Sequence, residues 1–184
     1  MPILAAEPSI LPENLLENFV DQDPERCWWA AYTKPRQEKS LSRQLCSLNI
    51  PHYLPLTSKT FLISGRRFTS QIPLFQSYLF LFVNEDERVN AMNTKRTLQL
   101  LPAPRRDEMT QDLQNIELLI KSGLPLNVES RLLPGHRVRV KTGALMGMEG
   151  AITTRRGEDR LFIAVRFLGQ GVSVQVEDFQ VEPA

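Results

Sequence analysis

Residues 71–83 read QIPLFQSYLFLFV, and this stretch decides how the first half of the chain folds. From Tyr78 to Val83 every residue is apolar or aromatic, so both faces of a strand here would be apolar. Two structures would explain the pattern: a strand buried on both sides, or a strand whose second face stays apolar for a partner protein. The rest of the sequence has to decide between them.

The residues around this strand predict a compact α+β unit over residues 27–122. Leu41, Leu45 and Leu48 recur at helical spacing, and Asn84 with Glu87 has the spacing of a capping box. The expected helices cover residues 37–48, 84–93 and 107–122. The expected strands cover residues 27–33, 52–56, 78–83 and 98–101, with a hairpin of residues 57–63 and 68–72 around Gly65.

The composition changes after this unit. Residues 123–131, GLPLNVESR, show no clear period and are interpreted as a linker. Beyond them, short stretches of alternating residues are separated by turns that are often rich in glycine, which favours a small β-barrel over residues 132–184. The expected strands lie within residues 136–141, 149–155, 160–167, 172–176 and 178–182.

The first 26 residues are rich in proline and acidic residues, and we expect a flexible extension there. Residues 12–19 could form a short helix with Leu15, Leu16 and Phe19 on one side. This segment is either a docking peptide or a loosely ordered terminus, and the sequence favours the second interpretation.

Charge and composition exclude several classes of protein. The chain has 184 residues and a formal net charge of +1, so contact with nucleic acid would need a local basic patch. Cys27 and Cys46 do not have metal-site spacing and fit a reduced, cytoplasmic compartment. No apolar run is long enough for a membrane span, and no secretion signal is recognisable at the N-terminus.

No constellation of residues in the sequence indicates catalysis. The chain has no P-loop, no dinucleotide fingerprint and no Cys/His ligand set. The two histidines, His52 and His136, lie in predicted strands and are interpreted as structural. Asp107 and Glu108 stand at a helix start, where carboxylates favour the backbone dipole. We therefore expect a protein that is not an enzyme and that has no metal or cofactor.

One motif in the C-terminal part is specific. Residues 135–152, GHRVRVKTGALMGMEGAI, resemble the KOW motif, in which glycines allow two strands to be joined by a tight loop. Ile152 occupies the final apolar position of the pattern. The matching motif residues are Gly135, Val138, Val140, Gly143, Gly147 and Gly150.

The N-terminal part adds a second resemblance. WWAAYTKPRQEK at residues 28–39 resembles the segment that opens the N-terminal domain of NusG, and the spacing to HYLPL and to IPLFQSYLFLFV also fits. The resemblance covers residues 27–184. It extends to RfaH, a specialised relative of NusG. Where the family often has Pro-Gly before the tyrosine, this chain has Gln76-Ser77, and the extra N-terminal residues suggest a specialised paralogue.

The resemblance implies an α+β fold, an antiparallel sheet with flanking helices, followed by a small SH3-like β-barrel, the KOW domain. It implies a bacterial transcription elongation or antitermination factor, which we expect to be a monomer. The N-terminal domain would bind the clamp helices of the RNA polymerase β′ subunit, and the KOW domain would recruit a ribosomal small-subunit protein or the termination factor Rho. By match to the family motif, the residues of the polymerase-binding depression would be Tyr32, Phe75, Tyr78 and Phe80.

The resemblance also implies a basic surface toward the non-template DNA strand. An ordinary solvated helix face would explain the same charges. The expected DNA-binding residues are Lys34, Arg36, Lys39, Arg43, Lys95 and Arg96, of which Arg36, Lys39 and Arg43 have the spacing of one helix face. The alternative function, a KOW-containing ribosomal or RNA-binding protein, would call for a strong basic excess, which the net charge does not provide.

Overall fold

The computed structural model describes residues 8–19, 23–155, 157–176 and 181–184. Packing divides the chain into two units, residues 1–106 and residues 107–184. Within the described residues, no helix has the length and apolar character that crossing a bilayer would require.

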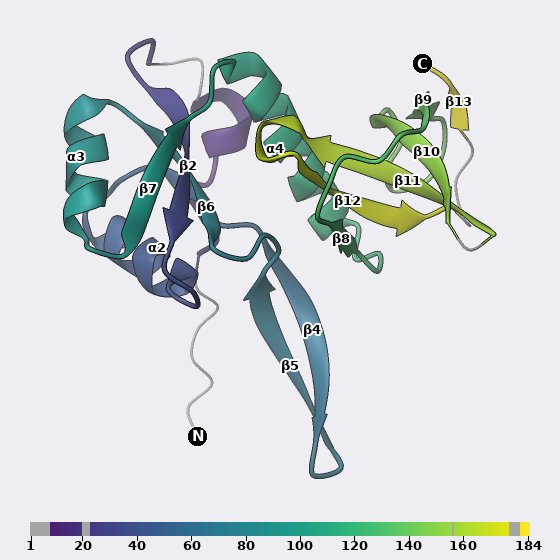
Figure 1. Cartoon of the computed structure of the whole chain (residues 1–184), viewed down its shortest axis with the longest axis horizontal. Coiled ribbons are helices and arrows are strands. Elements are labelled where there is room, and N and C mark those ends of the chain that lie inside the picture. The colour runs from purple at the N-terminus through teal and green to yellow at the C-terminus, as the bar shows by residue number, and fades with distance from the viewer. Residues whose placement is uncertain (1–7, 20–22, 156, 177–180) are drawn as a thin grey trace. The chain divides into compact units, whose positions relative to one another are not determined.

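The first unit is built on a five-stranded antiparallel sheet with the strand order β1-β3-β6-β2-β7 (Figure 1). Strand β2 (Cys27–Thr33) pairs on one side with β6 (Tyr78–Val83) and on the other with β7 (Thr97–Pro102). Strand β3 (His52–Tyr53) pairs with β6 and is followed outward by β1 (Ile10–Leu11). The strand predicted from residues 78–83 is therefore central in the sheet.

The central strand β6 is buried on both faces. Leu79, Leu81 and Val83 join the apolar cluster under the helices, while Phe80 and Phe82, which point to the other face, have exposed fractions of 0%. The first interpretation of the sequence, a strand buried on both sides, thus holds for residues 79–83. The second interpretation, an apolar face left open for a partner, does not hold for these residues, because only Tyr78 of Tyr78, Phe80 and Phe82 is partly accessible.

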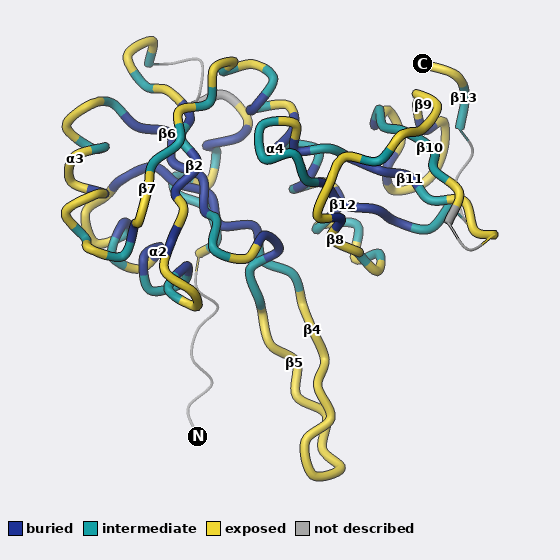
Figure 2. The backbone as a smooth tube through the Cα atoms, viewed as in Figure 1, coloured by how far each residue is buried: buried dark blue, intermediate teal, exposed yellow. Residues whose placement is uncertain are grey.

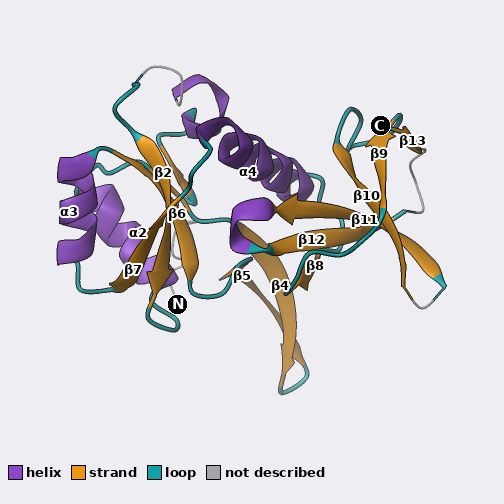
Figure 3. Ribbon diagram, turned by 45° about the horizontal axis from the view of Figure 1, so that its top comes forward, coloured by secondary structure: helices purple, strands orange, loops and turns teal. Residues whose placement is uncertain are grey.

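Two helices lie against one face of this sheet (Figure 3). Helix α2 (Glu38–Ser47) contributes Leu41 and Leu45 to the cluster, and α3 (Glu85–Asn93) contributes Ala91. The predicted capping box at the start of α3 is confirmed, since Asn84 Oδ1 accepts from the Glu87 N–H and the Glu87 carboxylate accepts from the Asn84 N–H. The capping box explains why α3 begins close to the predicted residue.

A long two-stranded ribbon extends from the first unit (Figure 1). It consists of β4 (Leu56–Ile63) and β5 (Arg66–Pro73), which form a two-stranded sheet of their own among the described residues. The turn is Ser64-Gly65, and both residues have positive φ, as a two-residue hairpin turn demands. The predicted hairpin is therefore confirmed, although its turn is shorter than expected. Figure 2 shows that most of the ribbon is exposed.

Part of the N-terminal extension belongs to the folded unit, contrary to the expected flexible segment. Ile10 and Leu11 form β1, and a helical turn (Leu15–Phe19) follows. Leu15 and Leu16 are buried. A two-residue strand is added by backbone hydrogen bonds alone, so no sequence period could reveal it. Residues 1–7 and 20–22 lie outside the described residues.

The second unit contains helix α4 (Arg106–Lys121), apart from its first residue, and a six-stranded antiparallel sheet. The strand order is β13-β9-β10-β11-β12-β8, so β13 and β8 stand at the two ends of this order. The strands are β8 (Asn127–Glu129), β9 (His136–Val140), β10 (Glu149–Arg155), β11 (Glu158–Val165), β12 (Gln170–Gln175) and β13 (Val181–Pro183), with a short 3-10 turn (Arg166–Leu168) before β12.

The predicted linker is partly a strand. Residues 127–129 pair with β12, and Ser173 Oγ donates to the buried Glu129 carboxylate at 2.8 Å. Three residues are too few for an alternating pattern, which is why the sequence showed none. The predicted strand at residues 178–182 is described from Val181 onward, and residues 177–180 lie outside the described part.

The glycines of residues 135–152 have identifiable structural roles. Gly147 has φ of 86° in the loop between β9 and β10, where its N–H donates to the Val140 carbonyl at 2.8 Å. A Cβ on Gly150 would lie 2.6 Å from Ile163 Cδ1 and 2.7 Å from the Phe162 carbonyl oxygen, so no side chain fits without displacement. Val138 and Val140 are buried as the alternation predicted.

Candidate functional site

An aromatic pair is exposed at one end of the central strands. Tyr32 on β2 pairs in register with Tyr78 on β6, and their ring centroids are 5.3 Å apart at an interplanar angle of 47°. Tyr32 has an exposed fraction of 38%, and Tyr78 is half-buried. Of the four predicted polymerase-binding residues, this aromatic pair offers apolar surface to a partner.

The other two predicted residues are buried. Phe75 has an exposed fraction of 1% and packs edge-to-face on Phe80, with ring centroids 6.2 Å apart. Phe80 itself is fully buried. The sequence could not separate these residues from the tyrosines, because all four are aromatic and lie in one short region. In this structure Phe75 and Phe80 are core residues and not part of an exposed depression.

The loop that leads into β6 is held by a buried carboxylate. Glu38, in the first turn of α2, has an exposed fraction of 6% and accepts a hydrogen bond from the Ser77 N–H at 2.7 Å. The Ser77 carbonyl accepts from the Thr33 N–H at 2.8 Å. Ser77 has φ of 63°, the left-handed conformation in which glycine is usual. Both contacts position the loop beside the aromatic pair.

The predicted basic residues converge from three segments of the first unit. The Lys34 N–H donates to the Arg96 carbonyl at 3.1 Å, which brings the segment after β2 next to the segment after α3. Lys34, Arg36 and Lys95 are exposed, and Lys39 is half-buried. Together with Arg43, these residues form what we call the basic rim, and Lys34 follows Tyr32 by only two residues.

Two of the predicted basic residues have positions that the sequence did not indicate. Arg36 has φ of 62° and precedes α2, so it does not lie on a helix face with Lys39 and Arg43. Arg96 is half-buried, and its guanidinium donates to the side-chain oxygens of Gln37 and Gln44. Arg96 is therefore a link between β7 and α2, and its charge is less available to a partner.

His52 is a buried structural residue, as predicted. Its Nδ1 lies 2.8 Å from the Ile50 carbonyl oxygen and its Nε2 lies 2.7 Å from Ser42 Oγ. A carbonyl can only accept, so Nδ1 carries the hydrogen and Nε2 accepts from the serine hydroxyl. Burial lowers the pKa of His52, and the hydrogen bond to Ile50 opposes that shift. The neutral ring therefore fits this site.

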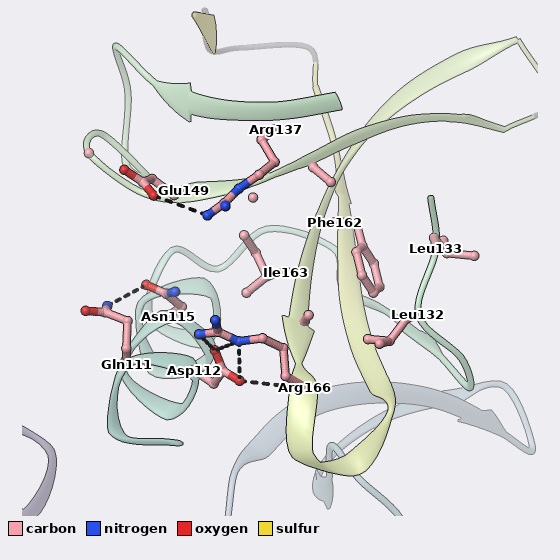
Figure 4. A pocket seen from close by; sticks show the side chains of 14 residues that line it. Gln111, Asp112, Asn115, Leu132, Leu133, Arg137, Glu149, Phe162, Ile163 and Arg166 are labelled. Carbon is pink, nitrogen blue, oxygen red and sulfur yellow. Dashed lines mark hydrogen bonds and ion pairs between the residues drawn. The ribbon is translucent and has the colours of Figure 1, made fainter. Parts of the chain in front are cut away.

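A pocket of about 600 Å³ lies in the second unit between α4 and the sheet (Figure 4). Its charged side chains are paired with each other. The carboxylate of Asp112 accepts from Arg166 Nη2 at 2.7 Å and from the Arg166 backbone N–H at 2.9 Å. Glu149 lies 3.9 Å from an Arg137 nitrogen. Because each charge has a partner, the pocket has no evident ligand-binding or catalytic group.

The described residues contain no group of three or more His, Cys, Asp or Glu side chains that could hold a metal ion. Sequence patterns missed Glu38, which has no special spacing, and the left-handed Ser77. The only available signal for Ser77 was the glycine that relatives often have at that position.

Comparison with known proteins identifies the first unit. The NusG family model, described as transcription termination factor nusG, matches residues 26–116. The chain is also similar to a solved structure titled "Domain interaction in Thermotoga maritima NusG", with 16% identity over 86% of this chain and 97% of that chain and a TM-score of 0.48. No curated protein matches the chain.

The matched segment includes every element of the candidate site. It begins one residue before β2, contains the aromatic pair, the basic rim and the ribbon, and ends within α4. The C-terminal sheet lies outside it. The match of residues 26–116 shows that this segment is a NusG-type domain and that the chain is a NusG-like factor.

Proposed function

We propose that this protein is a transcription elongation and antitermination factor that binds the clamp helices of the RNA polymerase β′ subunit through its N-terminal unit. The observation that carries the proposal is the exposed pair of Tyr32 and Tyr78 within the segment that the NusG family model matches. Partly exposed aromatic side chains on a rigid sheet are typical anchors of protein interfaces.

The buried residues below the pair support this role. Phe75 and Phe80 pack against each other, and the Glu38 carboxylate holds the loop between them. An interface residue contributes most when its position is fixed before binding, because less conformational entropy is then lost. In the proposed site the tyrosines contact the polymerase, while Phe75 and Phe80 keep the strand and loop in place.

The basic rim would contact the non-template DNA strand. Two of its exposed members, Lys34 and Arg36, follow Tyr32 by two and four residues, so a protein bound through the tyrosines would place these cations beside the polymerase surface. Phosphates would be held by charge alone, without base specificity. Binding of the basic rim to DNA can be tested separately from binding of the tyrosines to polymerase.

The C-terminal unit is proposed to be a KOW domain that closes into a small barrel and recruits a further partner. The glycines of the motif lie where the backbone requires them, and β8 and β13 are the strands that closure would bring together. A ribosomal small-subunit protein and the termination factor Rho are the two candidate partners. We propose residues 27–122 as the polymerase-binding domain, and the family match over residues 26–116 supports this proposal.

Binding of the full-length chain to a fragment that contains the β′ clamp helices tests the proposal. Tyr32→Ala should weaken this binding about tenfold or more, since truncated interface anchors typically cost about 2 kcal/mol. Tyr32→Phe keeps the ring and should bind nearly as the wild type does. Met92→Ala, which truncates an apolar residue on α3 with a similar exposed fraction of 37%, is the matched control.

Unchanged affinity of Tyr32→Ala together with an unchanged circular dichroism spectrum would overturn the proposed interface. Enrichment of ribosomes without polymerase, when the chain is used as bait in a lysate, would favour the alternative function as a ribosomal protein.

A further inference from the structure

The ribbon formed by β4 and β5 has no core of its own. Every residue from Ser58 to Gln71 is exposed. The side chains nonetheless include large apolar groups: Phe61 has an exposed fraction of 38%, Ile63 of 58% and Phe68 of 49%. An isolated two-stranded ribbon gains little from such residues in water, which indicates that they serve an interaction.

The strand register places these three residues on one face of the ribbon. Phe61 is opposite Phe68, and Ile63 is opposite Arg66, so these four side chains point to the same side, together with Lys59 two residues before Phe61. We call this side the basic aromatic face. The Lys59 Nζ lies 5.5 Å from the centroid of the Phe61 ring, within the range of a cation–π contact.

The opposite face, which we call the hydroxyl face, has Leu62 opposite Arg67 near the tip and polar residues along the middle of its length. Gln71 Nε2 donates to Ser58 Oγ at 2.7 Å, and the hydroxyl oxygens of Thr60 and Thr69 are 3.3 Å apart. These polar groups are hydrogen-bonded to each other across the two strands. The hydroxyl face therefore stabilises the ribbon itself, while the basic aromatic face has aromatic and cationic groups available for a ligand.

Charge indicates the class of ligand. Residues 56–73 contain Lys59, Arg66 and Arg67 and no acidic residue, although the whole chain has a net charge of only +1. In the described part of the chain, the side chains of Arg66 and Arg67 make no ion pair and no hydrogen bond. A polyanion such as a nucleic acid would neutralise this excess, because Lys and Arg side chains that contact phosphates release the counterions bound there.

The aromatic rings distinguish between forms of nucleic acid. In a duplex the faces of the bases are stacked on each other, but in a single strand they are free to stack on aromatic side chains. Phe61 and Phe68 lie side by side with Lys59 and Arg66 beyond them along the ribbon, so a base could stack while the adjoining phosphates meet a cation. Protein sites for single strands combine these two features.

A groove at the base of the ribbon continues this surface. It has a volume of about 470 Å³ and runs between β5 and the segment that starts α2. Arg36 and Lys39 of the basic rim line it from one side, and Ser70 and Ile72 line it from the ribbon. Ser70 and Ile72 are on the same face as Phe68, so cations continue from the tip of the ribbon to the rim.

We propose that the basic aromatic face of the ribbon binds single-stranded nucleic acid, with bases stacked on Phe61 and Phe68 and phosphates held by Lys59 and Arg66. The site differs from the tyrosine pair proposed for polymerase. It reaches the basic rim through the groove, yet its chemistry does not depend on polymerase binding. Its test uses no polymerase, so the two proposals succeed or fail separately.

The test is the fluorescence anisotropy of labelled oligothymidine and oligouridine, each about 16 nucleotides long, titrated with the full-length chain. Phe61→Leu/Phe68→Leu keeps apolar surface but removes the aromatic faces, and it should weaken binding about tenfold. Phe61→Tyr/Phe68→Tyr keeps the rings and should bind like the wild type. Thr60→Ala/Thr69→Ala changes neighbouring residues on the hydroxyl face and should leave the affinity nearly unchanged.

Salt and strandedness complete the test. Lys59→Gln/Arg66→Gln should reduce the slope of log affinity against log salt between about 50 and 200 mM, since fewer counterions are released. A duplex of the same length should bind more weakly than either single strand. Wild-type affinity of the Phe-to-Leu variant, or equal affinity for duplex and single strand, would overturn the proposal. If the Phe-to-Leu variant binds like the wild type, the basic aromatic face would instead be a protein-docking surface.

Discussion

The carboxylate of Glu38 accepts a hydrogen bond from the backbone N–H of Ser77, 39 residues further along the chain, at a distance of 2.7 Å. The contact joins the first turn of α2 to the loop that leads into the central strand. Glu38 is buried, so little water competes for the bond. The loop beside Tyr78 is thus held from within the fold and not by the partner.

Removing this carboxylate should therefore destabilise the first unit. Glu38→Ala leaves the Ser77 N–H without its acceptor and should lower the free energy of unfolding by about 2–3 kcal/mol, while Glu38→Gln retains an acceptor and should cost about 1 kcal/mol. Denaturation in urea measures both. Equal stability of Glu38→Ala and Glu38→Gln would contradict a role for the hydrogen bond.

Replacing Ser77 by glycine should stabilise the first unit. A residue with a side chain in the left-handed conformation costs about 1–2 kcal/mol, which exceeds the entropy that an added glycine gives to the unfolded chain. Ser77→Gly should raise the free energy of unfolding by about 0.5–1 kcal/mol. The control is Ser70→Gly, in the extended backbone of β5, which should have no stabilising effect. If Ser77→Gly were less stable than the wild type, the serine side chain would itself stabilise the folded state.

Phe75→Ala should affect stability more than any contact with a partner. Phe75 is buried against Phe80, and truncating a buried phenylalanine typically costs about 3–5 kcal/mol. Tyr32→Ala, at a partly exposed residue, should cost far less. Thermal unfolding of both variants measures the difference. An unchanged melting temperature for Phe75→Ala would mean that the side chain is not packed as described.

His52 should make stability depend on pH. In the unfolded chain a histidine has a pKa of about 6.5, and burial lowers the pKa of His52 in the folded chain. The neutral ring therefore makes its full contribution to the free energy of unfolding above about pH 6.5. This contribution is lost as the pH falls through the pKa that His52 has in the folded chain. Urea midpoints from neutral pH to about pH 5 should fall less steeply for His52→Gln. His136→Gln, at an exposed histidine, is the control and should follow the wild type.

The basic residues should separate into two groups. Lys34→Gln/Arg36→Gln/Lys95→Gln removes exposed charges and should weaken association with a transcription complex that has an exposed non-template strand, with a greater loss at low salt. Arg96→Gln removes the link to Gln37 and Gln44 and should mainly lower stability. If the triple variant associates normally at low salt, the basic rim is an ordinary solvated surface.

Local patterns in the sequence predicted most of the elements. The strand at residues 27–33 and the capping box at Asn84 depend on neighbouring residues, so they were recognisable without tertiary information. β1 and β8 were missed because two or three residues joined by backbone hydrogen bonds carry no period. Contacts between residues far apart in the sequence could not be predicted from local patterns. For this reason the sequence did not show that Phe75 is buried or that Arg96 donates hydrogen bonds to Gln37 and Gln44.

The contribution of the N-terminal residues has a practical consequence for work with fragments. A fragment cut at the start of the family match would lack β1 and would leave β3 as an unpaired edge, which invites pairing between copies. It would also lack Asp23, whose carboxylate lies 2.7 Å from an Arg26 nitrogen, while Arg26 in turn binds Glu87 at the cap of α3. Fragments for binding studies should therefore retain the residues that precede the conventional domain boundary.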